Sequence, residues 1–306
     1  MQVNLEQNPK AYVIINPVAG VSEAEAVRNT IQSALLSHNI SFDVYETTGH
    51  EDPRQLVREA VRQGYKLFVA AGGDGTLSAV ADGLVDTQVP LVIIPTGTWN
   101  ALARALSIPL QADRAIDLLF GEHIVRAIDT IQMEGRFYTL NVSVGIGSIA
   151  MSESKREEKR RIGKLHDFWN ALVQVMGFQT FRYEVTIDGK QTRFRALEVM
   201  IANSGIIGLK AVSLDPDIRM DDGKLNVCRI YAVNLIDYLK LGVSILLGKQ
   251  RENRSVSCME ALGEVEIRSK ARLPLQADGE IIGRLPVKVK LHPKALHIVT
   301  PRDSET

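Results

Sequence analysis

The sequence predicts an N-terminal doubly wound parallel α/β domain followed by a mostly antiparallel β-sandwich domain, with an active site in the cleft between them. A chain of 306 residues is long for one compact domain. Strand and helix patterns alternate in its first part, which is typical of a parallel sheet covered by helices. After Asp129 the pattern changes to successive short strands. We therefore expect an α/β domain over residues 1–129, to which the tail 295–306 could return, and a β-rich domain over residues 130–294.

The strands of the first domain are short apolar runs, and the helices between them are indicated by caps and helical spacing of apolar residues. A capping box, Ser22-Glu23-Ala24-Glu25, begins the first helix. Asp52 and Pro53 begin the second as N-cap and first-turn proline, and Gly64 ends it. Strands are expected over residues 11–16, 40–44, 66–71 and 89–94, and further helices over 77–85 and 99–106.

The second domain is indicated by strand patterns with turn residues between them. The dipeptide Asp188-Gly189 is typical of a tight hairpin turn. Helices are expected near residues 162–175 and 235–247, and the charged run 152–164 is expected to be solvated, so that the domains meet across a cleft. Strands are expected over residues 137–144, 183–187, 192–202, 224–231, 263–268, 273–277, 287–291 and 296–299.

Composition argues against several classes of function. The formal net charge is zero, whereas a dedicated nucleic-acid binder usually carries a broad basic surface. Cys228 and Cys258 form no CxxC pair and have no histidine at ligand spacing, so neither a disulfide framework nor a zinc site is expected. No secretory signal and no bilayer-spanning apolar segment is visible. We expect a cytoplasmic protein that does not bind nucleic acid.

The loop Gly72-Gly73-Asp74-Gly75-Thr76 lies between a buried strand and a helix. Glycines let consecutive N–H groups approach phosphate oxygens closely, and the helix adds the positive end of its dipole. A carboxylate repels phosphate, so Asp74 is explained if it holds a magnesium ion that bridges to the phosphates. The alternative is a tight turn in which Asp74 is only the helix N-cap.

Two further loops are expected at the same edge of the sheet, after residues 16 and 94. Ligands of open α/β sheets bind at the carboxyl ends of the strands, so the three loops together indicate a nucleotide pocket. No Walker A sequence is present, and Ser78 stands where a dinucleotide fingerprint needs glycine or alanine. A hydride-transfer enzyme therefore fits the glycine loop less well.

With these motifs the chain resembles the diacylglycerol kinase catalytic family, in its bacterial soluble lipid-kinase branch. The matching segments come in the family's order and span nearly the whole chain, although the glycine loop is shared with NAD kinases and sphingosine kinases. The segments are Asn16-Pro17-Val18-Ala19-Gly20, Gly72-Gly73-Asp74-Gly75-Thr76, Pro95-Thr96-Gly97-Thr98-Trp99-Asn100, Asp221-Asp222-Gly223 and Asp278-Gly279-Glu280.

The resemblance implies an ATP-dependent lipid kinase that transfers the γ-phosphoryl group of Mg-ATP to a hydroxyl of a lipid such as diacylglycerol. The implied catalytic residues are Asp74, which would organise the catalytic Mg²⁺, and Glu280, a general base for the attacking hydroxyl. A structural Mg²⁺ would be held by the carboxylate of Asp222 and the backbone carbonyls of Arg219 and Lys224. The residues implied to bind ATP are Asn16, Thr47, Thr48, Gly72, Gly73, Asp74, Gly75, Thr76, Thr98 and Asn100.

The chain departs from the family's usual pattern at two positions. Ser78 stands where asparagine is common, and Ala101 stands where an aspartate often follows the asparagine of the second loop. These departures leave open a lipid- or nucleotide-binding protein without turnover, and the shared glycine loop leaves open an NAD kinase. Without the resemblance, the segments around Asp222 and Glu280 would be interpreted as turns.

A lipid acceptor implies transient contact with a membrane surface, which for a cytoplasmic protein is the inner face of the membrane. The expected helix over residues 235–247, followed by Lys249, Arg251 and Arg254, could supply this contact. The alternative for this helix is core packing with a solvated charged end. The lipid tail needs an apolar cleft, and the sequence leaves a homodimer open.

Overall fold

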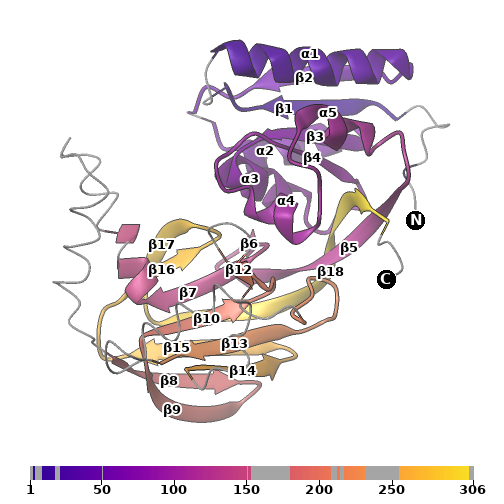
Figure 1. Ribbon diagram of the computed structural model, residues 1–306. Coiled ribbons are helices and arrows are strands. Elements are labelled where there is room, and N and C mark those ends of the chain that lie inside the picture. The colour runs from indigo at the N-terminus through magenta and orange to yellow at the C-terminus, as the bar shows by residue number, and fades with distance from the viewer. Residues whose placement is uncertain are drawn as a thin grey trace.

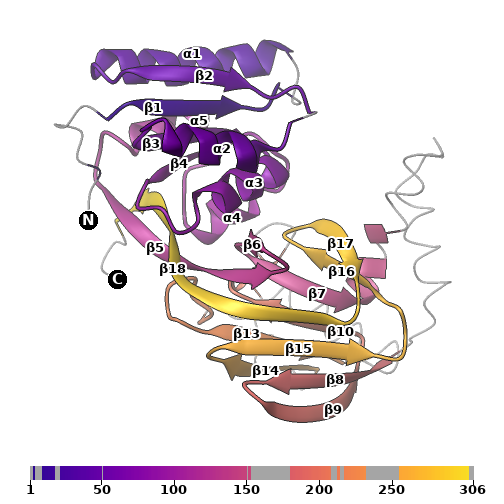
Figure 2. The same cartoon turned by 180° about the vertical axis from the view of Figure 1, so that it is seen from behind.

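The computed structural model describes residues 3, 9–17, 21–49, 51–149, 151–152, 180–207, 212–213, 217–231 and 255–302. The protein has two parts, a helix-covered sheet and a two-layer β-sandwich, which lie one above the other in Figures 1 and 2. The predicted fold class, a parallel α/β domain followed by an antiparallel β-sandwich, is confirmed. Among the described residues, no helix is long and apolar enough to cross a membrane.

The sheet of the first part has the strand order β2-β1-β3-β4, and neighbouring strands in this run are parallel. The chain winds outward from β1 to β2 and in the other direction from β3 to β4, so the winding reverses between β1 and β3. Every residue of β3 is buried, as expected for a parallel strand covered on both faces. The bounds are β1 Ala11–Ile15, β2 Phe42–Glu46, β3 Leu67–Gly72 and β4 Leu91–Pro95.

Helices cover both faces of this sheet. Helix α1 packs with α5, and α2 packs with α3; right-handed crossovers place α1 on one face and α2 and α3 on the other. Asp52 is the N-cap of α2, as predicted, and its carboxylate accepts the N–H of Arg54. Helix α1 begins one residue before the expected capping box. The bounds are α1 Val21–Ser37, α2 Pro53–Arg62, α3 Asp74–Leu84, α4 Ala101–Ala105 and α5 Ala112–Asp117.

Two antiparallel sheets form the sandwich. One has the order β18-β15-β8-β9 with β5 beside β18 and β6 beside β5, and the other has the order β14-β13-β10-β7-β16-β17. The predicted Asp188-Gly189 turn joins β8 to β9, with φ of 47° and 82°. The bounds are β5 His123–Met133, β6 Arg136–Tyr138, β7 Asn141–Gly145, β8 Phe181–Ile187, β9 Lys190–Ala196, β10 Glu198–Ala202, β11 Ile206–Ile207, β12 Val212–Ser213, β13 Leu225–Ile230, β14 Val256–Ala261, β15 Glu264–Ser269, β16 Pro274–Ala277, β17 Glu280–Arg284 and β18 Val287–Pro301.

Two long strands, β5 and β18, join the two parts (Figure 2). They pair with each other along their length, and Ile298 of β18 also pairs with Leu91 of β4, so the end of the chain returns to the parallel sheet. Ile128 and Ile298 belong to the apolar core of the first part, whereas Ile131 and Val289 belong to the core of the sandwich. A continuous antiparallel ribbon therefore runs from one core into the other.

Several strands differ from the prediction. The expected strand over 137–144 is divided into β6 and β7, because the N–H groups of Thr139, Leu140 and Asn141 bond to the carboxylate of Asp278. The expected strand over 192–202 is divided at Leu197, where the chain passes from one sheet to the other. The two strands expected after residue 287 are the single strand β18 with an irregularity in its pairing. Strands β5, β11, β12, β14 and β17 and helix α5 were not predicted.

Some expectations lie outside the described residues. These are the helices near residues 162–175 and 235–247, the basic residues Lys249, Arg251 and Arg254, and all but the first residue of the charged run 152–164.

Cys228 of β13 and Cys258 of β14 form a disulfide, which was not expected from the sequence. They are direct partners in the antiparallel pairing of the two strands, and such partners lie close enough for a disulfide to join them. The expectation was wrong because the cysteines are separated by 30 positions, and only the register of β13 and β14 brings them together.

Glu198 is a buried carboxyl group at the start of β10. The hydroxyl of Ser143 donates to its Oε1 at 2.7 Å, and the N–H of Gly147 donates to its Oε2 at 2.8 Å. Burial raises the pKa of Glu198 to about 7, and these two hydrogen bonds oppose the rise. The folded protein therefore keeps a proton on this group at pH values at which the unfolded chain would lose it.

We expect the free energy of unfolding to fall as the pH rises from the unfolded pKa of Glu198, 4.5, to its folded pKa of about 7. Because the pKa is raised, the stabilisation from Glu198 is fully present below its unfolded value of 4.5 and is lost as the pH rises through about 7. The change is on the order of 3 kcal/mol. A Glu198→Gln variant mimics the protonated group. Its free energy of unfolding, measured by urea denaturation between pH 4.5 and about 7, should lack this part of the dependence on pH. The same slope in variant and wild type would contradict this assignment.

Candidate active site between the two parts

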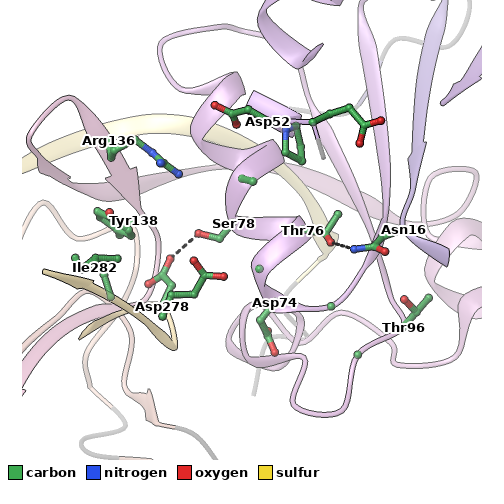
Figure 3. A pocket seen from close by; sticks show the side chains of 18 of the residues that line it. Asn16, Asp52, Asp74, Thr76, Ser78, Thr96, Arg136, Tyr138, Asp278 and Ile282 are labelled. Atoms are coloured by element: carbon green, nitrogen blue, oxygen red, sulfur yellow. Dashed lines mark hydrogen bonds between the residues drawn. The ribbon is translucent and has the colours of Figure 1, made fainter. Parts of the chain in front are cut away.

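A cavity of about 710 Å³ lies between the helix-covered sheet and the sandwich (Figure 3). The first part contributes the loops after β1, β2, β3 and β4, and the sandwich contributes β6 and the turn between β16 and β17. The cavity is therefore formed where the sequence predicts a cleft. Its lining residues are Asn16, Glu51, Asp52, Pro53, Gly73, Asp74, Gly75, Thr76, Ser78, Ala79, Thr96, Gly97, Thr98, Arg136, Tyr138, Ala277, Asp278, Glu280 and Ile282.

The glycine loop forms the first turn of α3. Strand β3 ends at Gly72, Gly73 is the extended N-cap, and the helix begins at Asp74. The N–H groups of a first helical turn lack helical partners, and the helix dipole favours an anion beside them. The interpretation of Asp74 as the N-cap is wrong, because Gly73 holds that position and Asp74 is the first residue of the helix.

Asn16 ties the loop after β1 to the glycine loop. Its Nδ2 donates to Oγ1 of Thr76 at 2.7 Å, and its backbone N–H donates to the carbonyl of Ala71 at 2.9 Å. Figure 3 shows the Asn16–Thr76 pair at one side of the cavity. The winding of the sheet reverses between the two strands that precede these loops, and ligands of doubly wound sheets bind at such a point.

The loop after β4 packs backbone to backbone against the glycine loop. A Cβ added to Gly97 would lie 2.7 Å from the Cα of Gly73, so this approach requires a glycine. Asn100 has a left-handed backbone, and its side chain accepts the N–H of Gly97 at 2.9 Å and donates to the carbonyl of Gly97 at 2.8 Å. Asn100 therefore shapes the loop without lining the cavity, whereas Thr98 lines it.

Asp74 lies where these two loops meet. Its Oδ1 accepts the N–H of Ala101 at 2.6 Å, which leaves Oδ2 as the oxygen that can face a ligand. A carboxylate oxygen beside phosphate oxygens and water suits a magnesium ion, so the residues present fit the ion predicted from the sequence. Ala101, where the family often has a carboxylate, contributes its backbone N–H instead.

Asp278 is a buried carboxylate that fixes the turn before β17. It accepts the N–H groups of Thr139, Leu140 and Asn141 at 2.7–3.1 Å, and the hydroxyls of Thr139 and Ser78 at 3.1 Å. Burial raises the pKa of Asp278, and its hydrogen bonds oppose the rise. The bond from Ser78 runs from α3 to the sandwich (Figure 3). The residue that departs from the family's pattern thus links the two walls of the cavity.

Glu280 is the first residue of β17, and its side chain lies in the cavity. The turn before it uses left-handed backbone at Asp278, with φ of 44°, and at Gly279, with φ of 85°. Oε1 of Glu280 lies 3.0 Å from the position that a Cβ of Gly75 would occupy. The carboxylate therefore reaches the first turn of α3, and the predicted pair Asp74 and Glu280 lines one cavity.

Arg136 supplies the positive charge of the cavity. Among the described lining residues it is the only lysine, arginine or histidine, whereas carboxylates come from five positions, Glu51, Asp52, Asp74, Asp278 and Glu280. The Nε of Arg136 donates to Oδ2 of Asp82, a buried residue of α3, at 2.6 Å. Burial acts to lower the pKa of Arg136, but the hydrogen bond and the charge of Asp82 outweigh it, so the pKa is raised.

Gly72, Thr47 and Thr48, which the sequence places in the ATP site, do not line the cavity. Gly72 packs on Thr76, since a Cβ there would lie 2.7 Å from the Cβ of Thr76, and Thr47 is buried. The hydroxyl and the N–H of Thr48 donate to Glu51 at 2.7 and 2.9 Å. These bonds hold the pKa of Glu51 down at about 2. Glu51, and not Thr48, therefore faces the cavity from this loop.

The predicted structural metal site, formed by Arg219, Asp222 and Lys224, lies outside the cavity, just before β13. Oδ1 of Asp222 accepts the N–H of Lys224 at 3.0 Å, and the buried carboxylate of Asp129 accepts the N–H of Gly223 at 2.7 Å. Burial and the charge of Asp129 raise the pKa of Asp222. The described residues hold no metal-binding cluster of three or more His, Cys, Asp or Glu side chains, and a site of one carboxylate and two carbonyls needs none.

Sequence reasoning missed Arg136, Tyr138, Glu51 and Ile282 as cavity residues. For Arg136 and Tyr138 the sequence offers a signal, the glycine in Glu134-Gly135. In the structure both of these residues have positive φ and form the turn between β5 and β6. Recognising that hairpin would have placed β6 beside β5, where Arg136 and Tyr138 line the cavity. No local pattern marks Ile282, whose position depends on the β16–β17 pairing.

The first turn of α3 faces the carboxylate of Glu280 in a cavity between the two parts, an arrangement suited to the phosphotransferase class of enzyme. Residues 10–133 match the diacylglycerol kinase catalytic domain, and residues 141–300 match the YegS C-terminal NAD kinase beta sandwich-like domain. The chain belongs to the diacylglycerol kinase catalytic family, in its bacterial lipid-kinase branch, and it is a lipid kinase.

Relatives support the same family. The diacylglycerol kinase of Bacillus subtilis (strain 168) is 24% identical over 96% of this chain and 97% of that protein. The protein named probable lipid kinase YegS-like of Pseudomonas syringae pv. syringae is 29% identical over 86% of this chain and 85% of that protein. The crystal structure of a diacylglycerol kinase from Bacillus anthracis str. Sterne has a TM-score of 0.77 at 23% identity, covering 95% of this chain and 97% of that chain. That likeness shows a shared fold.

A Gly97→Ala substitution should destabilise the folded protein. Its Cβ would lie 2.7 Å from the backbone of Gly73, which cannot move without displacing the glycine loop. We expect the free energy of unfolding to fall by about 1–3 kcal/mol, as for other overpacked sites, when measured by urea denaturation.

Gly75→Ala is the matched control. Its Cβ would meet the carboxylate of Glu280 at 3.0 Å, and that carboxylate ends a flexible side chain that can turn away. An alanine inside a helix also loses less entropy on folding than a glycine. We expect stability within about 0.5 kcal/mol of the wild type. Equal destabilisation by both substitutions would contradict the backbone contact between the two loops.

Proposed function

We propose that this lipid kinase transfers the γ-phosphoryl group of Mg-ATP to a hydroxyl group of a lipid such as diacylglycerol. The observation that carries the proposal is the position of Glu280, whose carboxylate lies against Gly75 in the first turn of α3. A proton acceptor is thereby held next to an anion-binding helix end. Phosphoryl transfer to an alcohol is accelerated by a proton acceptor placed beside the groups that bind the phosphate.

The phosphate chain of ATP would lie along the glycine loop. The first-turn residues of α3 and Thr98 line this side of the cavity, and the Asn16–Thr76 pair borders it. Asp74 would hold the Mg²⁺, which neutralises phosphate charge when bound. Of the residues proposed for ATP, Gly72, Thr47, Thr48 and Asn100 would act by shaping the loops.

The acceptor hydroxyl would lie between Glu280 and the γ-phosphorus. As the hydroxyl oxygen forms its bond to phosphorus, its proton passes to the carboxylate of Glu280, the bond from phosphorus to the bridging oxygen breaks, and ADP leaves. Asp278 is the positioning residue for Glu280, because its hydrogen bonds fix the turn from which Glu280 projects. Tyr138 and Ile282 provide apolar surface for the lipid on the same wall.

Four further assignments are part of the proposal. Asp222 and the carbonyls of Arg219 and Lys224 would hold a structural Mg²⁺. The domains would divide near residue 129, and the pairing of Ile298 with Leu91 supports the return of the tail. We further propose transient contact with the inner face of the membrane, from the cytoplasm, as a lipid acceptor requires. Fourth, we propose that the protein forms a homodimer, which a measurement of its mass in solution tests.

The substitutions Glu280→Gln and Asp74→Asn should separate catalysis from binding. With radiolabelled ATP and diacylglycerol in mixed micelles, Glu280→Gln should lower kcat by about 10²–10⁴-fold, the usual contribution of a general base. The Kd for Mg-ADP should change little, because the Gln side chain retains the shape of the carboxylate. Asp74→Asn should lower kcat at least about 10²-fold and should weaken the dependence on Mg²⁺.

Glu122→Gln is the matched control, since this carboxylate is 81% exposed and pairs with Arg302 at the surface. Turnover that survives both site substitutions would overturn the proposed roles. Phosphorylation of NAD without phosphorylation of lipid would show an NAD kinase, and binding of lipid or nucleotide without turnover would show an inactive member of the family.

A further inference from the structure

Charge in the cavity is distributed unevenly. Carboxylates come from both walls, and a ligand with phosphate groups would be repelled by them unless positive charge lies close to its oxygens. Asp74 with its proposed magnesium ion answers this need at the glycine loop. At the opposite end, beside Tyr138 and the start of α2, the described lining residues offer one cation, Arg136 (Figure 3).

Arg136 is held in place by a buried partner. Its Nε donates to Oδ2 of Asp82 at 2.6 Å, and the side chain of Asp82 is 1% exposed while that of Arg136 is 44% exposed. The bond uses one of the five N–H groups of the guanidinium. Arg136 lines the cavity and Asp82 does not. The guanidinium is thus oriented by the protein and open to a ligand.

The surroundings of Asp82 hold more positive charge than Asp82 can neutralise. Besides Arg136, Nη1 of Arg54 lies 3.8 Å and Nη2 of Arg58 lies 4.0 Å from its carboxylate oxygens. Arg54 also pairs with Asp52 at 3.3 Å. The three guanidinium groups outnumber the two carboxylates of this cluster, so its net charge is positive. An ion pair that only joins α3 to β6 would need Asp82 and Arg136 alone, so Arg54 and Arg58 supply positive charge beyond that structural need.

We propose that Arg136 binds an anionic oxygen of a substrate in the cavity, and that Asp82 is the residue that positions it. This inference rests on the proposed function. The anionic oxygen belongs either to the phosphate chain of the nucleotide or to a phosphodiester in the headgroup of the acceptor lipid. A planar guanidinium held through its Nε presents parallel N–H groups that match phosphate oxygens.

The test compares Arg136→Met with the wild type in two arms. In the nucleotide arm, the Kd for Mg-ADP and for adenosine is measured by calorimetry. In the acceptor arm, KM is measured for diacylglycerol, which is neutral, and for phosphatidylglycerol, which carries a phosphodiester and free hydroxyls. Loss of one charge-assisted hydrogen bond should raise either the Kd for Mg-ADP or the KM for phosphatidylglycerol by about 10–100-fold. The values for adenosine and diacylglycerol should stay within about twofold.

Three further variants separate binding from a structural role. Asp82→Asn should weaken the same ligand less than Arg136→Met does, because the guanidinium keeps its charge but loses its anchor. Arg136→Lys should restore part of the affinity, since it keeps the charge without the planar group. Arg62→Met is the matched control, because Arg62 lies on α2 with a side chain that is 72% exposed and pairs with Glu59.

The inference is wrong if Arg136→Met folds, as judged by thermal unfolding, and leaves every Kd and KM within about twofold. Equal weakening of charged and neutral ligands would also contradict it, since that pattern indicates a distorted cavity. If Arg136→Met does not fold, Arg136→Lys decides: intermediate weakening supports the inference, and wild-type affinity contradicts it. A wild type that binds neither Mg-ADP nor lipid overturns the proposed function and this inference together.

Discussion

The arrangement of the site depends on the buried carboxylate of Asp278. Removing a carboxylate from water costs several kcal/mol, and here three backbone N–H groups and two hydroxyls offset that cost. The backbone donors interrupt the strand between β6 and β7, and the hydroxyl of Ser78 comes from α3. Because the turn to β17 begins at Asp278, the same bonds determine where Glu280 lies. One desolvated charge thus fixes the break in a strand, a contact between the two parts and the position of the proposed base.

The side of the cavity proposed for phosphate is shaped by close backbone contact between loops. Gly97 lies against Gly73, and Asn100 holds the loop in the conformation that allows this. Asn16 bonds to Thr76, so three strand ends of the parallel sheet meet around the first turn of α3. The two sides belong to separate apolar cores that share the strands β5 and β18. The cavity is therefore built from the edge of the parallel sheet and from a turn that is far away in sequence.

The sequence predicts the features of this structure that depend on local pattern. The parallel strands, the N-cap Asp52 and the hairpin at Asp188-Gly189 all follow from spacing and turn chemistry, and the structure has them. It could not predict features that depend on register or on distant partners. The break before β7 requires Asp278, and the disulfide requires the pairing of β13 with β14. Arg136 reaches the cavity only through the hairpin of β5 and β6, and Asp82, which does not line the cavity, is connected to it only through its bond to Arg136.

The central claim is that the phosphate chain of the nucleotide lies between the first turn of α3 and Glu280. A crystal structure with Mg²⁺ and a non-hydrolysable ATP analogue tests it most directly. We expect phosphate oxygens within hydrogen-bonding distance of the N–H groups of Gly75 and Thr76, a metal ion beside Asp74, and the terminal phosphate facing Glu280. A nucleotide bound with its phosphates away from this turn, or with Glu280 remote from the terminal phosphate, would contradict the account.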